Sequence, residues 1–197
     1  IVQSISVIFL NQFLLPYGNE KIAAMGIAFK AVSIVNLVLV GLAYGGQPMF
    51  GYLIGASQRK RLRELFRFNL AVMIIVAVVL SSIVFAAAPA IVRFFMSQPQ
   101  IVADGSRMLR LQVVTMTLAG VVLLLTLVFQ SAGRIAISFV LSIARQGFIF
   151  LTVLFLLSWW FGYEGILAAQ AVADCVSVCF AGLLFYRYIY RSWIKEE

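Results

Sequence analysis

The chain has 197 residues, of which 63% are hydrophobic and only 11% carry a charge, and its mean hydropathy is +1.06. A soluble domain is only about half apolar, so this composition excludes a soluble globular domain and indicates an integral membrane protein. The net charge of +8 would also suit a nucleic-acid-binding protein, but the basic residues lie between long apolar segments, and the positive-inside rule explains that placement better. We therefore expect a lipid bilayer around the chain and no nucleic acid partner.

The residue types that enzyme chemistry needs are scarce. The chain has no histidine, which removes Ser-His-Asp and Cys-His catalysis and histidine metal sites. Its two cysteines, Cys175 and Cys179, fall within one predicted helix and lack metal-ligand spacing. We expect neither an enzyme nor a metal site or cofactor.

Six apolar segments predict an all-α integral membrane protein of six transmembrane helices, since about 20 apolar residues cross a bilayer core. Their approximate limits are 1–16, 22–54, 68–92, 108–130, 135–161 and 165–186. The first segment starts without a methionine or a charged stretch, so we expect a fragment that is cut inside or just before this helix. Short connections are expected at YGNEK (17–21), FMSQPQIVADG (95–105) and SAGR (131–134), where Gly133 ends a helix.

The basic residues predict an orientation. They gather after the second segment, in the SAGR connection and after the last segment, as Arg59, Lys60, Arg61, Arg63, Arg67, Arg134, Arg187, Arg191 and Lys195. An even number of crossings places all of them on one side, which the positive-inside rule assigns to the cytoplasm together with both ends of the sequence. Trp159, Trp160 and Tyr163 predict an aromatic belt at the outer interface.

The second segment carries a glycine-rich stretch that runs into the basic cluster. Gly41 and Gly45 are four residues apart, as are Gly51 and Gly55, and this spacing lets another helix approach closely in a bilayer. Pro48 removes a helical hydrogen bond, so we expect a kink there. The stretch indicates either a moving part or a packing motif of the kind found in many membrane proteins.

Polar residues inside the helices are candidates for lining a substrate cavity, because each is costly in contact with lipid. The candidates are Asn11 and Gln12, beside Ser4, in the first segment; Ser33, Asn36, Tyr44 and Gln47 in the second; and Thr117 and Gln130, with Thr115 and Thr126, in the fourth. The stripes on the first two helices could line one cavity. Alternatively, the amides could join neighbouring helices, and the threonines could bond to their own backbone.

Three ionisable residues are expected at a similar depth in the membrane. Asp174 lies near the middle of the last segment, and both Arg145 and Lys30 are candidate partners for it. Asp174 is either half of a structural ion pair or a cation or proton site. Arg107 and Arg110, near the outer end of the fourth segment, are expected to extend toward the interface.

Several motifs, in the same order along the chain, resemble the second half of the MATE (multidrug and toxic compound extrusion) transporters. They are AAMGIAFK (23–30), GLAYGGQPMFGYLIGASQRKRLRE (41–64), FQSAGR (129–134), SIARQG (142–147) and GYEGILAAQAVAD (162–174). The resemblance implies a twelve-helix transporter in the plasma membrane, of which residues 1–197 form the C-terminal six-helix lobe. Its partner would be the N-terminal lobe of the same protein.

What the resemblance implies for mechanism is alternating access, with cationic or amphipathic compounds exported while sodium ions or protons flow inward. One departure is that the segments corresponding to the seventh and tenth helices lack the acidic residues of some MATE proteins, so coupling would depend on Asp174 or on the other lobe. Two alternatives remain: a flippase for a lipid-linked precursor from the wider superfamily, which a cavity with several arginines would favour, and a nontransporting membrane subunit, which a purely apolar interior would favour.

Overall fold

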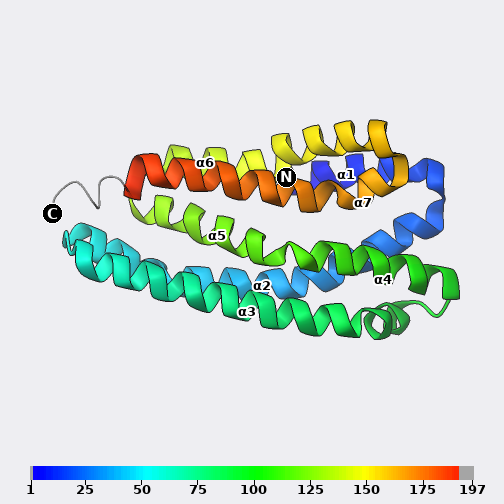
Figure 1. Cartoon of the computed structure of the whole chain (residues 1–197), viewed down its shortest axis with the longest axis horizontal. Helices are drawn as coiled ribbons and strands as arrows, with labels where there is room; N and C mark the ends of the chain where they lie inside the picture. Colours follow the sequence, from blue (N-terminus) through cyan, green and yellow to red (C-terminus); the bar gives the residue numbers. More distant parts are fainter. Residues whose placement is uncertain (1, 191–197) are drawn as a thin grey trace.

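The computed structural model describes residues 2–190, and these residues form helices joined by short connections (Figure 1). The α-helices are α1 (Val2–Leu14), α2 (Asn19–Gly55), α3 (Arg59–Phe95), α4 (Pro99–Val114), α5 (Met116–Ser131), α6 (Ile135–Ile143) and α7 (Phe150–Phe185). A short 3-10 segment, η1 (Leu15–Tyr17), follows α1, and two π-helical segments, η2 (Ala144–Ile149) and η3 (Tyr186–Tyr190), precede and follow α7. Two of the basic residues assigned to the cytoplasmic side, Arg191 and Lys195, lie outside the described residues.

The described helices make six passes along the bundle, although their boundaries do not coincide with single passes. α4 and α5 form one pass that bends by 42° between Val114 and Met116. α6, η2 and the first part of α7 form the next pass, which ends at Gly162, where φ is +56° and ψ is −128°. Only glycine adopts this conformation readily, so Gly162 reverses the chain and separates the last two passes. The all-α, six-helix prediction is confirmed.

Length and composition support membrane insertion of these passes. α2, α3 and the stretch Ile135–Ile189 are long and apolar enough to cross a membrane, and α4 with α5 counts as a fourth span if the bent pair is one crossing. Since Gly162 divides Ile135–Ile189, that stretch of 55 residues supplies two passes. α1, with 13 residues, is shorter than the roughly 20 residues that a complete crossing needs.

Two connections are shorter than the sequence suggested. α3 begins at Arg59 rather than near residue 68, so the basic cluster lies on the first turns of a helix, and the turn before it is made by Ser57 at φ +55°. The expected loop at 95–105 shrinks to residues 96–98, because Pro99 starts α4. Proline suits the first helical turn, where its missing N–H has no helical partner to lose.

Gly133 ends α5 in the expected way. Its φ is +71°, and the N–H groups of Gly133 and Arg134 donate to the carbonyls of Gln130 and Phe129. These two bonds form a Schellman motif, which satisfies carbonyls that the helix end leaves open. The tight turn sends α6 back antiparallel to α5 (Figure 1).

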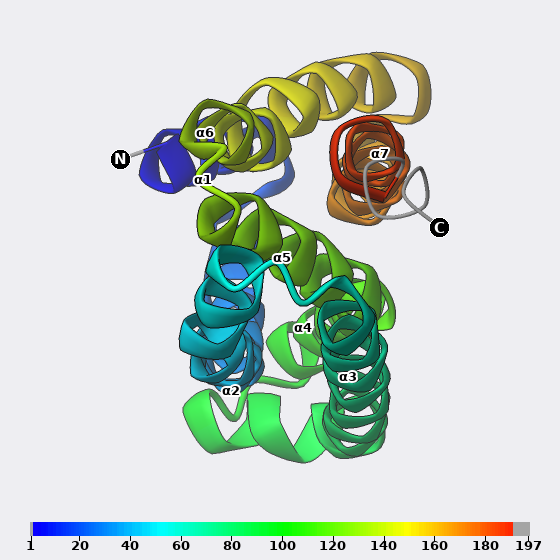
Figure 2. The ribbon, with the colours of Figure 1, turned by 90° about the vertical axis from the view of Figure 1, so that its left-hand side faces the viewer.

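The helices form two groups. α2, α3 and α4 pack together with α5, and α5 also contacts α6 and α7, which lie with α1 in the second group (Figure 2). One apolar cluster, around Phe50, Met73 and Phe129, fills what we call the basic end, where residues 56–58 and 132–134 turn. A second cluster, around Leu14, Met108 and Leu154, fills the opposite end, where Gly18, residues 96–98 and Gly162 turn.

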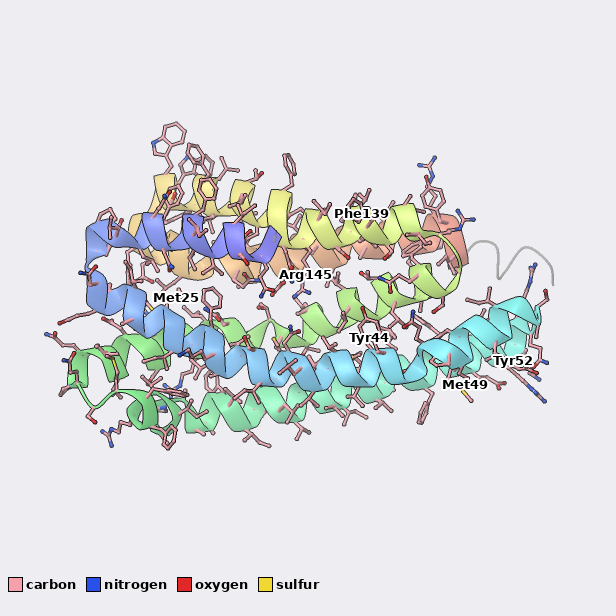
Figure 3. The ribbon with its side chains drawn as sticks, turned by 180° about the vertical axis from the view of Figure 1, so that it is seen from behind. Met25, Tyr44, Met49, Tyr52, Phe139 and Arg145 are labelled. Carbon is pink, nitrogen blue, oxygen red and sulfur yellow. The ribbon has the colours of Figure 1, made fainter. Side chains whose placement is uncertain are left out.

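The glycine spacing of α2 does not serve packing within the described chain. A Cβ added at Gly41, Gly45, Gly51 or Gly55 would meet nothing within 4 Å. Tyr44, Met49 and Tyr52, labelled along α2 in Figure 3, are 49%, 58% and 69% exposed. The helix continues through Pro48, and the expected kink stays a prediction.

Candidate functional site

Asp174 on α7 lies at the centre of a buried polar cluster. Its side chain is 4% exposed, and Arg145 Nε lies 3.3 Å from Oδ1. Thr115 Oγ1–H donates to Oδ2 at 3.1 Å, and Gln170 Nε2–H donates to Oδ1 at 3.4 Å. A carboxylate in a low-dielectric interior stays charged only if donors and an opposite charge compensate its lost hydration, and these three side chains supply both.

Helix interruptions bring these donors together. Thr115 sits at the break between α4 and α5, with φ −93° and ψ +1°. Arg145 lies within the π-helical segment η2, and Gln170 lies one turn before Asp174 on α7. Single π-helical turns are frequent at functional sites because they rotate side chains out of the regular helical register.

A small cavity of about 100 Å³ adjoins the Asp174–Arg145 pair. Its polar lining comes from Gln3 and Ser6 on α1, Ser33 and Asn36 on α2, Gln112 on α4, Arg145 and Gln146 on η2, and Gln170 and Asp174 on α7. Figure 3 shows Arg145 between the two helix groups. Ser6 donates a hydrogen bond to the carbonyl of Gln146, which joins α1 to η2 beside the cavity.

The structure brings only part of the predicted set to this cavity. Of the eight residues predicted for a substrate cavity, Ser33 and Asn36 line it. The others lie elsewhere: Asn11 is half-buried, Gln12 lines a separate groove beside Tyr17 and Trp159, Tyr44 and Gln47 lie farther along α2, Thr117 lines a groove against α3, and Gln130 lies near the end of α5. Ser33 and Asn36 of the α2 stripe therefore share this cavity with Gln3 and Ser6 of α1, and not with Asn11 and Gln12.

The structure distinguishes the two candidate partners of Asp174. Arg145 is the partner of Asp174, whereas Lys30 is exposed and has no ion pair in the described part of the chain. Arg107 and Arg110 do not simply extend toward solvent. Arg107 Nη2 lies 2.8 Å from Glu164 Oε2, and Arg110 Nε donates to the carbonyl of Phe85 at 3.2 Å.

Sequence reasoning missed four residues of the cavity: Gln3, Ser6, Gln112 and Gln146. Gln112 is 6% exposed, and its Nε2 lies 2.9 Å from Met25 Sδ. A signal was present, because Gln112 precedes Thr115 by one helical turn and Gln146 adjoins Arg145. Over residues 2–190 no group of three or more Cys, Asp or Glu side chains is placed to hold a metal ion.

Interrupted helices that meet at a buried polar site in mid-bundle are typical of membrane carriers, and these features define the class of this protein. Residues 1–156 match the family described as MatE. That match covers well over half of the chain, so the chain belongs to the MATE family of membrane transporters, as the sequence motifs predicted; it is not an enzyme family.

Known proteins agree with this membership. The multidrug export protein MepA of Staphylococcus haemolyticus is 28% identical over 186 residues, which are 94% of this chain and 41% of that protein. An inward-facing multidrug resistance MATE family transporter of the MOP superfamily superposes with a TM-score of 0.91 at 18% identity, over 100% of this chain and 46% of the other. An outward-facing structure of such a transporter gives 0.89 at 17% identity, over 100% and 44%. At these identities the solved structures show the fold alone, and the chain spans less than half the length of each.

Proposed function

We propose that this chain is the C-terminal six-helix lobe of a multidrug efflux antiporter, which exports cationic or amphipathic compounds in exchange for sodium ions or protons by alternating access. The observation that carries the proposal is the buried Asp174 carboxylate, which donors from the α4–α5 break, η2 and α7 hold beside a polar cavity. A membrane protein retains a buried charge at such a cost mainly where ions or substrates pass.

The exposed glycine face of α2 supports the half-transporter assignment. In the described chain, nothing lies within 4 Å of where a Cβ would stand at Gly41 and Gly45, which is the geometry that a closely packed second helix needs. The N-terminal lobe of the same protein is the partner that fits. α1 and α2 lie on one side of the bundle in Figure 2, and the cavity is bounded by these two helices, so that lobe would cover both the glycines and the cavity.

We propose that the coupling step is the replacement of Arg145, the charged partner of Asp174, by a proton or a sodium ion. In the structure the Arg145 guanidinium neutralises the carboxylate. A proton or a sodium ion that reaches Asp174 would replace this charge, release Arg145 and change the contacts between η2 and α7. The lobe has the fold of both an inward-facing and an outward-facing transporter, at TM-scores of 0.91 and 0.89, so this exchange does not require the lobe to refold.

We propose further that the basic end faces the cytoplasm, in the plasma membrane, and that the chain enters α1 and leaves α7 on that side. Arg59, Lys60, Arg61 and Arg63 begin α3 there, and Arg134 lies in the neighbouring connection. The positive-inside rule favours this orientation.

The alternatives find less support. A flippase for a lipid-linked precursor needs several arginines to hold a pyrophosphate in its transport cavity, but Arg145 is the one arginine that lines the polar cavity in the described chain, and it is already paired. Arg93, Arg107 and Arg110 lie outside that cavity, near one end of the bundle. A nontransporting subunit would suit a purely apolar interior, whereas the side chains between the two helix groups include two buried or half-buried charges.

Efflux of a fluorescent cationic dye tests the proposal. Cells that express the full-length protein are loaded with dye, and efflux is followed with and without a sodium gradient for the wild type, Asp174→Asn and the matched control Asp104→Asn. We expect Asp174→Asn to abolish efflux at normal protein level and Asp104→Asn to retain it. No efflux from the wild type under any gradient would overturn the antiporter assignment, and full efflux from Asp174→Asn would overturn the role of Asp174.

A further inference from the structure

A second, larger hollow lies away from the Asp174 cavity. It is a cleft of about 990 Å³ at the end of the bundle opposite the basic end. The last turns of α3, the α4 helix and the parts of α7 on both sides of Gly162 form its walls. α3 and α7 lie on the side of the bundle away from α1 and α2, as Figure 2 shows. The cleft is therefore separate from the proposed transport cavity and from the surface proposed for the other lobe.

The walls of this cleft are apolar and its charges are mainly positive. Phe85, Pro89, Leu111, Val114, Leu157 and Phe161 supply apolar surface. Three arginines, Arg93, Arg107 and Arg110, line the same space against one carboxylate, Glu164. An amphipathic anion is the ligand that such a lining complements.

The arginines are engaged to different degrees. Arg110 uses its Nε–H on the carbonyl of Phe85, and its guanidinium lies 5.1 Å from the centre of the Phe85 ring, so four of its five N–H donors remain. Arg107 pairs with Glu164 at 2.8 Å, but their side chains are 59% and 56% exposed. Arg93 is exposed and has no ion pair in the described residues. The cleft thus keeps uncompensated positive charge in reach of a ligand.

The depth of the cleft matches that of lipid headgroups. Trp159 and Trp160 follow the lining residue Leu157 within one turn of α7 and are 76% and 74% exposed. Exposed tryptophans gather at the level where hydrocarbon gives way to headgroups. The arginines at the same end of the bundle therefore lie near the phosphate level, and the apolar walls of the cleft extend toward the hydrocarbon core.

We propose that this cleft binds an anionic phospholipid. Arg93 and Arg107 hold its phosphate, and Arg110 lies about one helical turn deeper in the cleft. The acyl chain lies along Phe85, Leu111 and Leu157. Basic pockets between transmembrane helices bind anionic headgroups by the same chemistry. A soluble phosphate would use the guanidinium groups but not the apolar walls. An acidic peptide would bring no chain for those walls either.

Native mass spectrometry of the purified full-length protein tests the site, with palmitoyl-oleoyl phosphatidylglycerol as the probe and the phosphatidylcholine of the same chains as the neutral comparison. We expect the tightest-bound lipid to be phosphatidylglycerol. Arg93→Gln and Arg107→Gln should each weaken its binding about fivefold, since one basic residue near an anionic headgroup contributes about that factor. Glu164→Gln should strengthen it, because Arg107 is then released for the phosphate.

Matched variants separate this site from other basic surfaces. Arg67→Gln removes the same charge at the basic end and should leave the tightest phosphatidylglycerol site unchanged. Val114→Trp, at an exposed residue of the cleft wall that lies deeper along α4 than the arginines, should block the acyl chain while leaving every arginine in place. Since Arg93 has no protein partner to lose, Arg93→Gln reports on binding even if Arg107→Gln disturbs the fold.

Three results would overturn the proposal. The first is equal affinity for the two lipids, and the second is an equal loss in Arg67→Gln and Arg93→Gln. The third is that Val114→Trp binds phosphatidylglycerol normally while inorganic phosphate or glycerol phosphate competes for the site, which would assign it to a soluble anion. None of these measurements depends on dye efflux, so the lipid site and the antiporter assignment can fail separately.

Discussion

Arg110 on α4 donates its Nε–H to the backbone carbonyl of Phe85 on α3, at 3.2 Å, and its guanidinium also lies against the Phe85 ring. That carbonyl is the one that Pro89 deprives of its helical donor, because proline has no N–H to offer the residue four positions before it. A side chain from the neighbouring helix thus completes the backbone bonding of α3 at its proline, in the manner that lipid-embedded helices require.

This relationship predicts a dependence between the two residues. Arg110→Met should lower the free energy of unfolding by about 1 kcal/mol, because the carbonyl loses its partner. In a Pro89→Ala background the helical N–H returns, so the same Arg110→Met substitution should cost much less. Thermal denaturation in detergent of the wild type, the two single variants and the double variant measures the coupling. Equal losses of stability in both backgrounds would show that the hydrogen bond from Arg110 to the carbonyl does not contribute to stability.

The Asp174–Arg145 pair predicts a second coupling. Arg145→Met should destabilise the protein by about 3–5 kcal/mol, since it leaves a buried carboxylate without its counter-charge. The double variant Arg145→Met/Asp174→Leu should recover most of this loss, because no buried charge remains. Stability by thermal denaturation checks the prediction, with Lys30→Met, which removes an exposed and unpaired charge, as the control expected to change little. A double variant no more stable than Arg145→Met would contradict it.

The reversal at Gly162 depends on a second glycine. A Cβ at Gly165 would stand 2.0 Å from the backbone oxygen of Leu157, which cannot move aside as a flexible side chain could. Gly165→Ala should therefore destabilise the protein by more than the roughly 1–3 kcal/mol of ordinary overpacking. Gly182→Ala, on the same helix with nothing within 4 Å, should be tolerated. Expression and monodispersity on gel filtration report the difference, and similar behaviour of the two variants would disprove the constraint.

The glycine face of α2 predicts an effect on function rather than on folding. Gly41→Leu and Gly45→Leu should leave the level of the full-length protein in the membrane unchanged, because nothing in this chain packs there, but should reduce dye efflux severely by obstructing the other lobe. Gly182→Leu, also at an open glycine, is the control that should retain efflux. Normal efflux from both α2 variants would remove this face from the proposed contact between lobes.

The sequence alone determined the class, the six helices and the family. Apolar segments of membrane-spanning length and the glycine motifs are local features, because neighbouring residues determine hydropathy and backbone conformation. The absence of histidine and the order of the glycine, Gln-Pro and SAGR motifs can be read directly from the sequence. Gly133 illustrates this, because its positive φ and the backbone hydrogen bonds to Gln130 and Phe129 end α5 within a few residues of sequence. Asp174 stood out for a similar reason, since any carboxylate in the middle of a span must find a partner.

Tertiary structure decided which side chains meet. The sequence left both Arg145 and Lys30 as candidate partners for Asp174. The π-helical segment η2, which no sequence pattern predicted, places Arg145 beside Asp174. The break at Thr115 and the phase of α1 likewise decided that Gln112 and Ser6, rather than Thr117 and Asn11, line the polar cavity. Depth along a helix follows from counting residues, but the direction of a side chain around the bundle depends on how whole helices pack and where they are interrupted.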